Sequence, residues 1–452
     1  MKITKQIFAV LMTSMYCLAV YAEEATVIII SEGNPKGRPI AVAPFEWKGM
    51  QSQPPQDMAK IIGDDLERSG IFKPIERAKF QSNPSLDGKV NFANWRIIKS
   101  ESLLIGRITD IGADNYEVAF ALYDVFRQKR LLPKDDSLGG IRYKVKKSRL
   151  RGQAHVIADK VFEELTGDPG AFNTQLAYVQ HTPGMGNPYF LYVTDADGYN
   201  RRKVLESPTP ILSPSWSRDG EHVAYSRKSG RSWQVTIQNL YSGQRKLLSD
   251  LHPQLKNARS VSAPSWSPDS SKLAFTMSKN NNYDIYVAGV KSGFFKRITT
   301  HFEVDTEPTW MPDGKSLVFT SSRGGSPQLY RKSISGGSAK RLTFEGKYNA
   351  RATISPDGRN LVFVHGKQNT YHIGLLDMER GSFNLLTTEL DTLYESPSFA
   401  PNGLMIVYTA GKIGGKYTPL KVLSVDGRAN FSIKALEKDD IREPAWSYFL
   451  SK

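Results

Sequence analysis

The chain has 452 residues, of which 40% are apolar and 23% charged, so its length allows two or three domains. This ordinary globular composition excludes collagen-like, coiled-coil and wholly disordered proteins. Lys and Arg outnumber Asp and Glu by 60 to 45, a net charge of +15 that favours acidic partners, and the single cysteine excludes both a disulfide framework and a cysteine-rich zinc site.

The N-terminus predicts export. Residues 1–22 place Lys2 and Lys5 before an almost unbroken apolar run that ends on small residues, as a cleaved signal peptide does. An uncleaved membrane anchor is the alternative. The residues before Cys17 are too large for a lipoprotein signal. A mature chain that starts near Glu23 has no cysteine, which suits the bacterial periplasm, and no later apolar run is long enough to cross a membrane.

Residues 23–167 predict a compact N-terminal α/β (α+β) domain of ordinary size. Two short β-rich runs come first, at 25–30 and 39–45. A helix is expected over 54–69, because its apolar residues recur at helical spacing and two prolines suit its first turn.

The second half of this domain predicts a hairpin and a further helix. The runs 103–111 and 116–123 alternate in polarity and flank a turn, so we expect them to pair. A helix is expected over 148–165, with Ser148 as its N-cap and Gly167 as its C-terminal stop.

From residue 170 to 452 helical spacing disappears and a unit related to Trp-Ser-Pro-Asp-Gly recurs before a β-rich run. The Asp or Asn of this unit repeats about every 45 residues, at Asp219, Asp269, Asp313, Asp357 and Asn402. A hairpin glycine recurs at a similar period and has six copies: Gly198, Gly243, Gly293, Gly337, Gly381 and Gly427. This period with four short strands per unit predicts an all-β, six-bladed β-propeller over 170–452.

The repeated Asp or Asn and the repeated hairpin glycine differ in their number of copies, five against six. This difference predicts how the ring closes. Only five units are complete. Residues 444–447 supply the first half of a sixth unit, and residues 175–179 supply its second half. We therefore expect strands from both ends of the repeat region to share one blade, which leaves no open edge strand.

Catalytic motifs are not found in the sequence. The seven histidines form no His-Glu-x-x-His pattern, and Gly-x-Ser-x-Gly does not occur. The repeated Ser-Pro-Asp-Gly could be mistaken for a metal loop, but its recurrence in each unit indicates turn chemistry. Asp64 and Asp65 lie in the first predicted helix and are interpreted as a solvated face. Binding is therefore favoured over catalysis, with no cofactor and no metal site.

A binding surface is predicted where the inner strands of the blades begin. The loops before these strands are rich in Tyr, Arg, Asn and acidic residues, and they all differ, whereas the repeated unit beside them is uniform. A uniform core with individual loops is typical of a recognition surface. Ordinary surface loops are the alternative.

Taken together, these features resemble the TolB family, the periplasmic component of the Tol–Pal system of Gram-negative bacteria. The motifs that carry the resemblance run through the chain: the signal peptide, 37–47, 143–145, 151–167, 176–179, 195–200, the Trp-Ser-Pro-Asp repeats, 306–310 and 444–447. The resemblance implies a non-enzymatic adaptor whose propeller face binds Pal, an outer-membrane lipoprotein. It also implies that the mature N-terminal segment binds TolA, an inner-membrane protein. Such a protein maintains the outer membrane and draws it inward during division.

By position, the resemblance assigns the residues that face Pal: Ser260, Ala263, Asp305, Thr306, Glu307, Tyr348, Arg351, Tyr394 and Glu395. It assigns TolA binding to a mobile segment: Glu23, Glu24, Ala25, Thr26, Val27, Ile28, Ile29, Ile30, Ser31, Glu32 and Gly33. We expect a monomer without a nucleic-acid partner, which can also bind other envelope proteins. Two alternatives stay open: a propeller that binds peptidoglycan or polysaccharide, and a propeller lyase or dehydrogenase.

Overall fold

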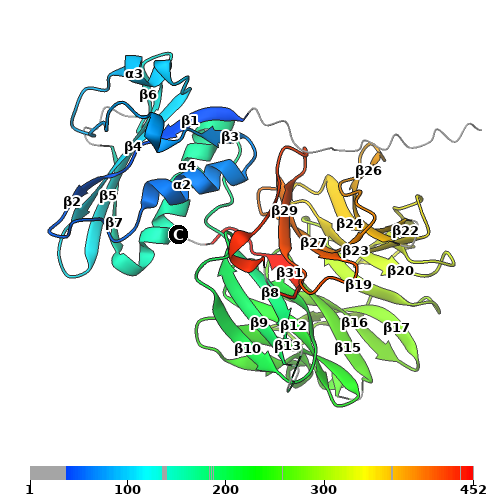
Figure 1. Cartoon of the computed structure of the whole chain (residues 1–452). Helices are drawn as coiled ribbons and strands as arrows, with labels where there is room; N and C mark the ends of the chain where they lie inside the picture. Colours follow the sequence, from blue (N-terminus) through cyan, green and yellow to red (C-terminus); the bar gives the residue numbers. More distant parts are fainter. Residues whose placement is uncertain are drawn as a thin grey trace, which may run out of the picture.

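The computed structural model describes residues 37–450 apart from 135–139, 183, 185, 187, 257, 368, 369 and 438. The predicted signal peptide, the β-rich run 25–30 and the segment 23–33 lie outside the described residues. The described residues form an N-terminal domain of mixed helices and strands and a propeller of β-sheets (Figure 1). In the described part of the chain, no helix is both long and apolar enough to span a bilayer.

The N-terminal domain is a twisted sheet with helices on both faces. Its elements are β1 (Arg38–Val42), β2 (Glu46–Lys48), α2 (Met58–Arg68), β3 (Phe72–Pro74), η1 (Arg77–Lys79), α3 (Phe92–Ile97), β4 (Ser102–Asp110), β5 (Asn115–Asp124), β6 (Lys129–Leu132), β7 (Ile141–Lys146), η2 (Lys147–Arg149) and α4 (Leu150–Thr166). The strand order is β3-β1-β4-β5-β6, with β2 on β4 and β7 on β5. The predicted hairpin is β4 and β5, which pair antiparallel along their length.

Strand alternation divides the apolar residues of this sheet between two cores. Leu104, Val118 and Phe120 pack with α2 and α4 on one face. Leu103 and Ile105, one residue out of phase, pack with α3 on the other. The larger core therefore holds α2 and α4 side by side.

Both predicted helices are present, but each begins later than expected. Helix α2 starts at Met58 because Asp57 is its N-cap and accepts the Lys60 N–H at 3.0 Å, so the two prolines lie before the helix. The N-cap of α4 is Arg149 without a side-chain hydrogen bond, and the prediction of Ser148 as N-cap is wrong because Ser148 lies within η2. Gly167 ends α4 in the left-handed conformation, as predicted.

The propeller has six four-stranded antiparallel blades, which confirms the predicted fold. Written from inner to outer strand, the first two blades are β31 (Ile441–Trp446), β8 (Gln175–His181), β9 (Tyr189–Asp195) and β10 (Arg202–Ser207), and then β11 (Ile211–Trp216), β12 (His222–Ser229), β13 (Ser232–Asn239) and β14 (Arg245–Leu247). The third and fourth blades are β15 (Ser260–Trp266), β16 (Lys272–Lys279), β17 (Asn282–Gly289) and β18 (Phe295–Arg297), and then β19 (Asp305–Trp310), β20 (Ser316–Ser321), β21 (Gln328–Ser333) and β22 (Lys340–Arg341). The fifth and sixth blades are β23 (Tyr348–Ile354), β24 (Asn360–Lys367), β25 (Thr370–Asp377) and β26 (Phe383–Leu385), and then β27 (Thr392–Phe399), β28 (Met405–Lys412), β29 (Leu420–Ser424) and β30 (Asn430–Ser432). Short helical segments α5 (Leu248–Leu251), η3 (Pro253–Leu255) and η4 (Lys434–Leu436) connect blades.

The repeated unit has a structural role in each blade. The indole N–H of Trp310 donates to the carbonyl of Ser265 in the neighbouring blade at 3.1 Å, and Trp216 donates to Ala445 at 3.0 Å. The carboxylate of Asp219 accepts the N–H of Glu221 at 2.9 Å within the turn that follows. The tryptophan therefore joins adjacent blades, while the aspartate fixes the turn.

One blade combines the two ends of the repeat region. Strand β31, near the end of the chain, pairs antiparallel with β8, the first propeller strand. The indole N–H of Trp446 donates to the Thr174 hydroxyl at 2.8 Å, and the Gln175 N–H donates to the Ser447 hydroxyl at 2.9 Å.

Strand register defines two faces of the propeller. Asp305 at the start of β19 pairs with Ser321 at the end of β20, and the other blades repeat this pairing. The loops before the inner strands and the hairpins between second and third strands therefore share one face, here called the loop face. The Asp-Gly turns lie on the opposite face, the turn face. The N-terminal domain contacts the turn face, where Asn402 donates to the Pro169 carbonyl at 3.1 Å and Arg151 pairs with Asp197.

Candidate functional site

Each inner strand carries a bulge with one residue in the left-handed region. The register shifts once in each of the six inner strands. The bulged residues have φ between 51° and 55° and line one cavity of ≈ 270 Å³ around the propeller axis: Ser213, Ala263, Glu307, Arg351, Ser396 and Glu443. A non-glycine residue in this conformation costs roughly 1–3 kcal/mol, so its recurrence indicates that blade packing imposes it.

Arg351 contacts three other members of this ring. Its Nη1 donates to Glu443 Oε1 at 2.6 Å and to Ser396 Oγ at 3.0 Å, and its Nε lies 3.3 Å from Glu307 Oε1. Glu443 holds the pKa of Arg351 above its usual range, and this effect outweighs burial. The guanidinium therefore links side chains of four blades across the channel, and its charge is already paired within the chain.

The predicted Pal-facing residues differ in accessibility. Asp305 is fully buried and pairs with Arg323, whose Nη2 lies 2.8 Å from a carboxylate oxygen. Tyr394 is buried beside His372 and Tyr408, and burial raises the pKa of its phenol. Among the other seven, Ser260 is buried and Glu395 is exposed. Five are half-buried: Ala263, Thr306, Glu307, Tyr348 and Arg351. The structure thus brings all nine to the inner strands but leaves few of them open to a partner.

Apolar side chains that the sequence analysis did not select are exposed on the loop face. Phe302 is 81% exposed and Phe344 is 71% exposed, in the loops before β19 and β23. These two and seven further exposed apolar side chains of the same face are here called the loop-face patch: Tyr283, Phe302, Val304, Phe344, Tyr371, Leu390, Leu393, Ile413 and Tyr417. Exposed apolar side chains that gather on one face are typical of protein interaction sites. Sequence pattern missed them because it does not separate an exposed loop aromatic from a buried one.

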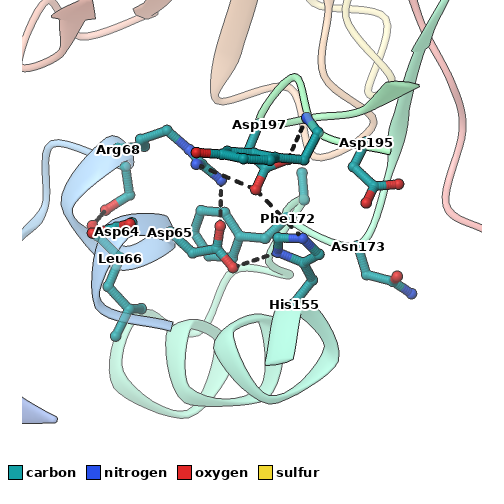
Figure 2. Close-up of polar contacts among 12 residues, drawn as sticks. Asp64, Asp65, Leu66, Arg68, His155, Phe172, Asn173, Asp195 and Asp197 are labelled. Carbon is teal, nitrogen blue, oxygen red and sulfur yellow. Dashed lines mark hydrogen bonds and ion pairs between the residues drawn. The ribbon is translucent and has the colours of Figure 1, made fainter. Parts of the chain in front are cut away.

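A second polar cluster lies between the domains (Figure 2). It contains Asp65 and Arg68 of α2, His155 and Arg151 of α4, and Asp197 from the turn between β9 and β10, and is here called the interdomain cluster. Asp65 is fully buried, so its assignment to a solvated face is wrong, whereas Asp64 is half-exposed and pairs with Lys60. Helix periodicity could not find this cluster, because its members are far apart in sequence.

The interdomain cluster has the geometry of a cation site, but its carboxylates do not have the unpaired negative charge that a cation site needs. Ligand atoms of Asp65, His155 and Asp197 lie within 4.8 Å of one another. The guanidinium groups of Arg68 and Arg151 already pair with the two carboxylates. A divalent cation there would meet two positive charges, so the residues fit an ion-pair network better than a metal site.

Comparisons with known proteins give one consistent family. Residues 26–131 match the model of the TolB amino-terminal domain, and residues 162–450 match the TolB beta propeller domain. A Tol-Pal system protein TolB of Nitrosococcus oceani is 48% identical, covering 93% of each chain. One from Hydrogenovibrio crunogenus is 43% identical, covering 97% of each chain.

A solved structure agrees with these sequence matches. The crystal structure of TolB from Acinetobacter baumannii matches with a TM-score of 0.78 and 34% identity, covering 92% of this chain and 98% of that chain. Both domains, in the same order, are thus shared with proteins of one family. The chain belongs to the TolB family of Tol-Pal system proteins.

Proposed function

We propose that this chain is a non-enzymatic adaptor that binds a Pal-like outer-membrane lipoprotein through its loop face. The loop-face patch is the observation that carries the proposal, because it lies on the face away from the N-terminal domain in a chain of the TolB family. Aromatic and aliphatic side chains supply most of the affinity of protein interfaces when a partner buries them.

We assign each of the nine predicted Pal-facing residues either a contact role or a structural role within this proposal. Glu395, Thr306 and Tyr348 have open surface and would contact the partner. Asp305, Tyr394 and Ser260 are buried and would hold their strands in place instead. Arg351 and its ring would keep the blades at the spacing that the partner recognises.

The remaining parts of the proposal concern the N-terminus and the compartment. We propose that Glu23–Gly33 binds a TolA-like inner-membrane protein, and that the chain is exported to the periplasm of a Gram-negative bacterium with a cleaved signal peptide. There the adaptor would maintain outer-membrane integrity and its invagination during division. The basic-apolar leader pattern and the family membership support this proposal.

The double variant Phe302→Ser, Phe344→Ser is expected to weaken binding of a Pal-like lipoprotein at least tenfold. Each substitution removes a large apolar side chain that the partner would bury, and central aromatic contacts often contribute above about 1 kcal/mol each. Binding is measured by titration calorimetry with the lipoprotein's soluble domain, after capture of the partner from a periplasmic extract.

Tyr241→Ser is the matched control, because Tyr241 is 78% exposed and lies in the turn between β13 and β14 on the opposite face. It should bind like the unmodified chain. If the Phe302 and Phe344 variants bind normally, the loop-face patch is not the partner site. Retention of a glycan without any lipoprotein would favour the polysaccharide-binding alternative.

Deletion of residues 23–33 is expected to abolish binding to a TolA-like domain while leaving the thermal midpoint of unfolding within a few degrees. The deleted residues precede β1, so the described domain cores keep all their side chains. Surface-plasmon resonance measures the affinity and circular dichroism the midpoint. Unchanged affinity for the TolA-like domain contradicts the assignment of this segment.

A further inference from the structure

The propeller inserts one carboxylate into the N-terminal domain. Asp197 lies in the turn between β9 and β10, and its side chain is 2% exposed. It pairs with Arg151, and Arg68 Nη1 lies 3.9 Å from its Oδ2 (Figure 2). A carboxylate loses its hydration when it is buried, so docking of the two domains is favourable only if cations of the N-terminal domain compensate the charge.

His155 lies between this carboxylate and a second one. Its Nδ1 is 2.6 Å from Asp65 Oδ2, and its Nε2 is 3.6 Å from Asp197 Oδ2. The imidazole is 2% exposed, and within the described residues Nε2 has no hydrogen-bond partner. Either neutral tautomer therefore points a ring lone pair at a carboxylate, whereas the imidazolium points an N–H at each of them.

The charges that face His155 come from three elements. They are Asp65 and Arg68 of α2, Arg151 and Asp159 of α4, and Asp195 and Asp197 of the β9–β10 turn region. Without Asp159, three carboxylates face two guanidinium groups, so one positive charge is lacking. A proton on His155 supplies that charge.

Asp159 is a second group near His155 that binds a proton more tightly because it is buried. Its carboxylate accepts the N–H groups of Phe172 at 2.7 Å and Asn173 at 3.1 Å, in the segment that joins the domains. Burial raises the pKa of Asp159 to about 7, although these two hydrogen bonds oppose the shift. Burial alone would lower the pKa of His155, but Asp65 and then Asp197 outweigh it, so the pKa is raised above that of an ordinary histidine.

We propose that the N-terminal domain docks on the propeller with uptake of a proton at His155, so that the interdomain interface is tight at acidic pH and loosens as pH rises. Asp65 belongs to the same domain as His155 and acts on it in both states, whereas Asp197 faces it only in the docked state. The docked histidine therefore gains proton affinity from Asp197, and this contribution is complete below the pKa of the undocked form. It is lost as pH rises through the pKa of the docked form. The proposal concerns how the two domains are held together, and it is independent of the proposed partners.

Pulsed electron–electron double resonance, which measures the distance between two spin labels, tests the proposal on the full chain. Spin labels are placed at Ala93→Cys in α3 and Lys279→Cys in β16, both exposed, in a Cys17→Ser background. Between the two pKa values, the ratio of docked to undocked molecules should fall by up to about tenfold per pH unit. His155→Gln should remove most of this dependence, and the part that remains should end near pH 7, where Asp159 loses its proton.

His222→Gln is the matched control, because His222 lies on β12 of the propeller and contacts Asn239 rather than the N-terminal domain. It should keep the pH profile of the unmodified chain. An unmodified chain whose distance distribution is constant from pH 5.5 to 9 would overturn the proposal. So would a His155→Gln variant that keeps the full pH dependence.

A second measurement is independent of whether His155→Gln folds. Imidazole signals of the unmodified chain are titrated by nuclear magnetic resonance and assigned by comparison with variants at the other histidines. A pKa of His155 that is higher in the unmodified chain than in an Asp197→Asn variant supports proton-linked docking, because Asp197 is the propeller carboxylate that faces the ring. Equal pKa values in the two chains overturn it, because docking would then bind no extra proton at His155.

Discussion

Replacement of Trp446 by alanine is expected to lower the free energy of unfolding of the propeller by about 3–5 kcal/mol. Trp446 is 8% exposed and packs in the cluster that joins β31, β8 and the blade of β27. The substitution leaves a cavity at the junction of the chain ends, and it also leaves the Thr174 hydroxyl without its indole donor. Urea denaturation followed by tryptophan fluorescence and circular dichroism measures the change.

Phe449→Ala is the matched control for this prediction. Phe449 is three residues further along the chain, and it is 42% exposed. Its removal should change the free energy of unfolding by less than about 0.5 kcal/mol. If Trp446→Ala unfolds at the same urea concentration as the unmodified chain, the pairing of β31 with β8 does not stabilise the ring.

Replacement of Arg351 by methionine is expected to cost about 2–3 kcal/mol of the free energy of unfolding. Removal of one partner from a fully buried ion pair costs ~3–5 kcal/mol because the other charge is left unpaired. The side chain of Arg351 is 35% exposed, so solvent screening reduces this value. The Glu443 carboxylate, whose side chain is 12% exposed, would be left in the channel without its main cation.

A second substitution separates lost charge pairing from lost packing. Glu443→Gln in the Arg351→Met background should recover part of the stability, because the unpaired carboxylate is removed. Arg380→Met is the control, since Arg380 is 82% exposed and lies 3.9 Å from Asp377. Denaturant midpoints are compared for all four chains. Equal midpoints for the Arg351 and Arg380 variants would show that the ring contributes no more than a surface pair.

Local sequence signals located the secondary structure well where chemistry acts within a few residues. The β4–β5 hairpin and the Gly167 stop agree with the predictions, because alternation and glycine conformation are local properties. The helix starts were placed too early. Proline is compatible with a first turn, but Asp57 supplies the actual capping oxygen, and Ser148 belongs to a separate short helix.

The candidate site was only partly accessible to sequence reasoning. The inner strands were correctly chosen as the place where the loops gather, but exposure could not be read from residue type. Asp305 resembles an ideal surface contact in the sequence, yet Arg323 pairs with it in the interior. Phe302 resembles a core residue, yet it is 81% exposed. Burial depends on which blades meet, and the repeat pattern does not encode that for each side chain.

The amino-acid sequence by itself determined the two-domain order and the six blades, because helical spacing gives way to turn residues that recur at a fixed period. It also determined the family, because the motifs that carry the resemblance run in order through both domains. Only the tertiary structure decided the ring around Arg351, the loop-face patch and the interdomain cluster. His155 lies 90 positions from Asp65 and 42 from Asp197, yet all three side chains meet between the domains. Such contacts form when two separately folded surfaces dock, so the spacing of residues in the sequence does not predict them.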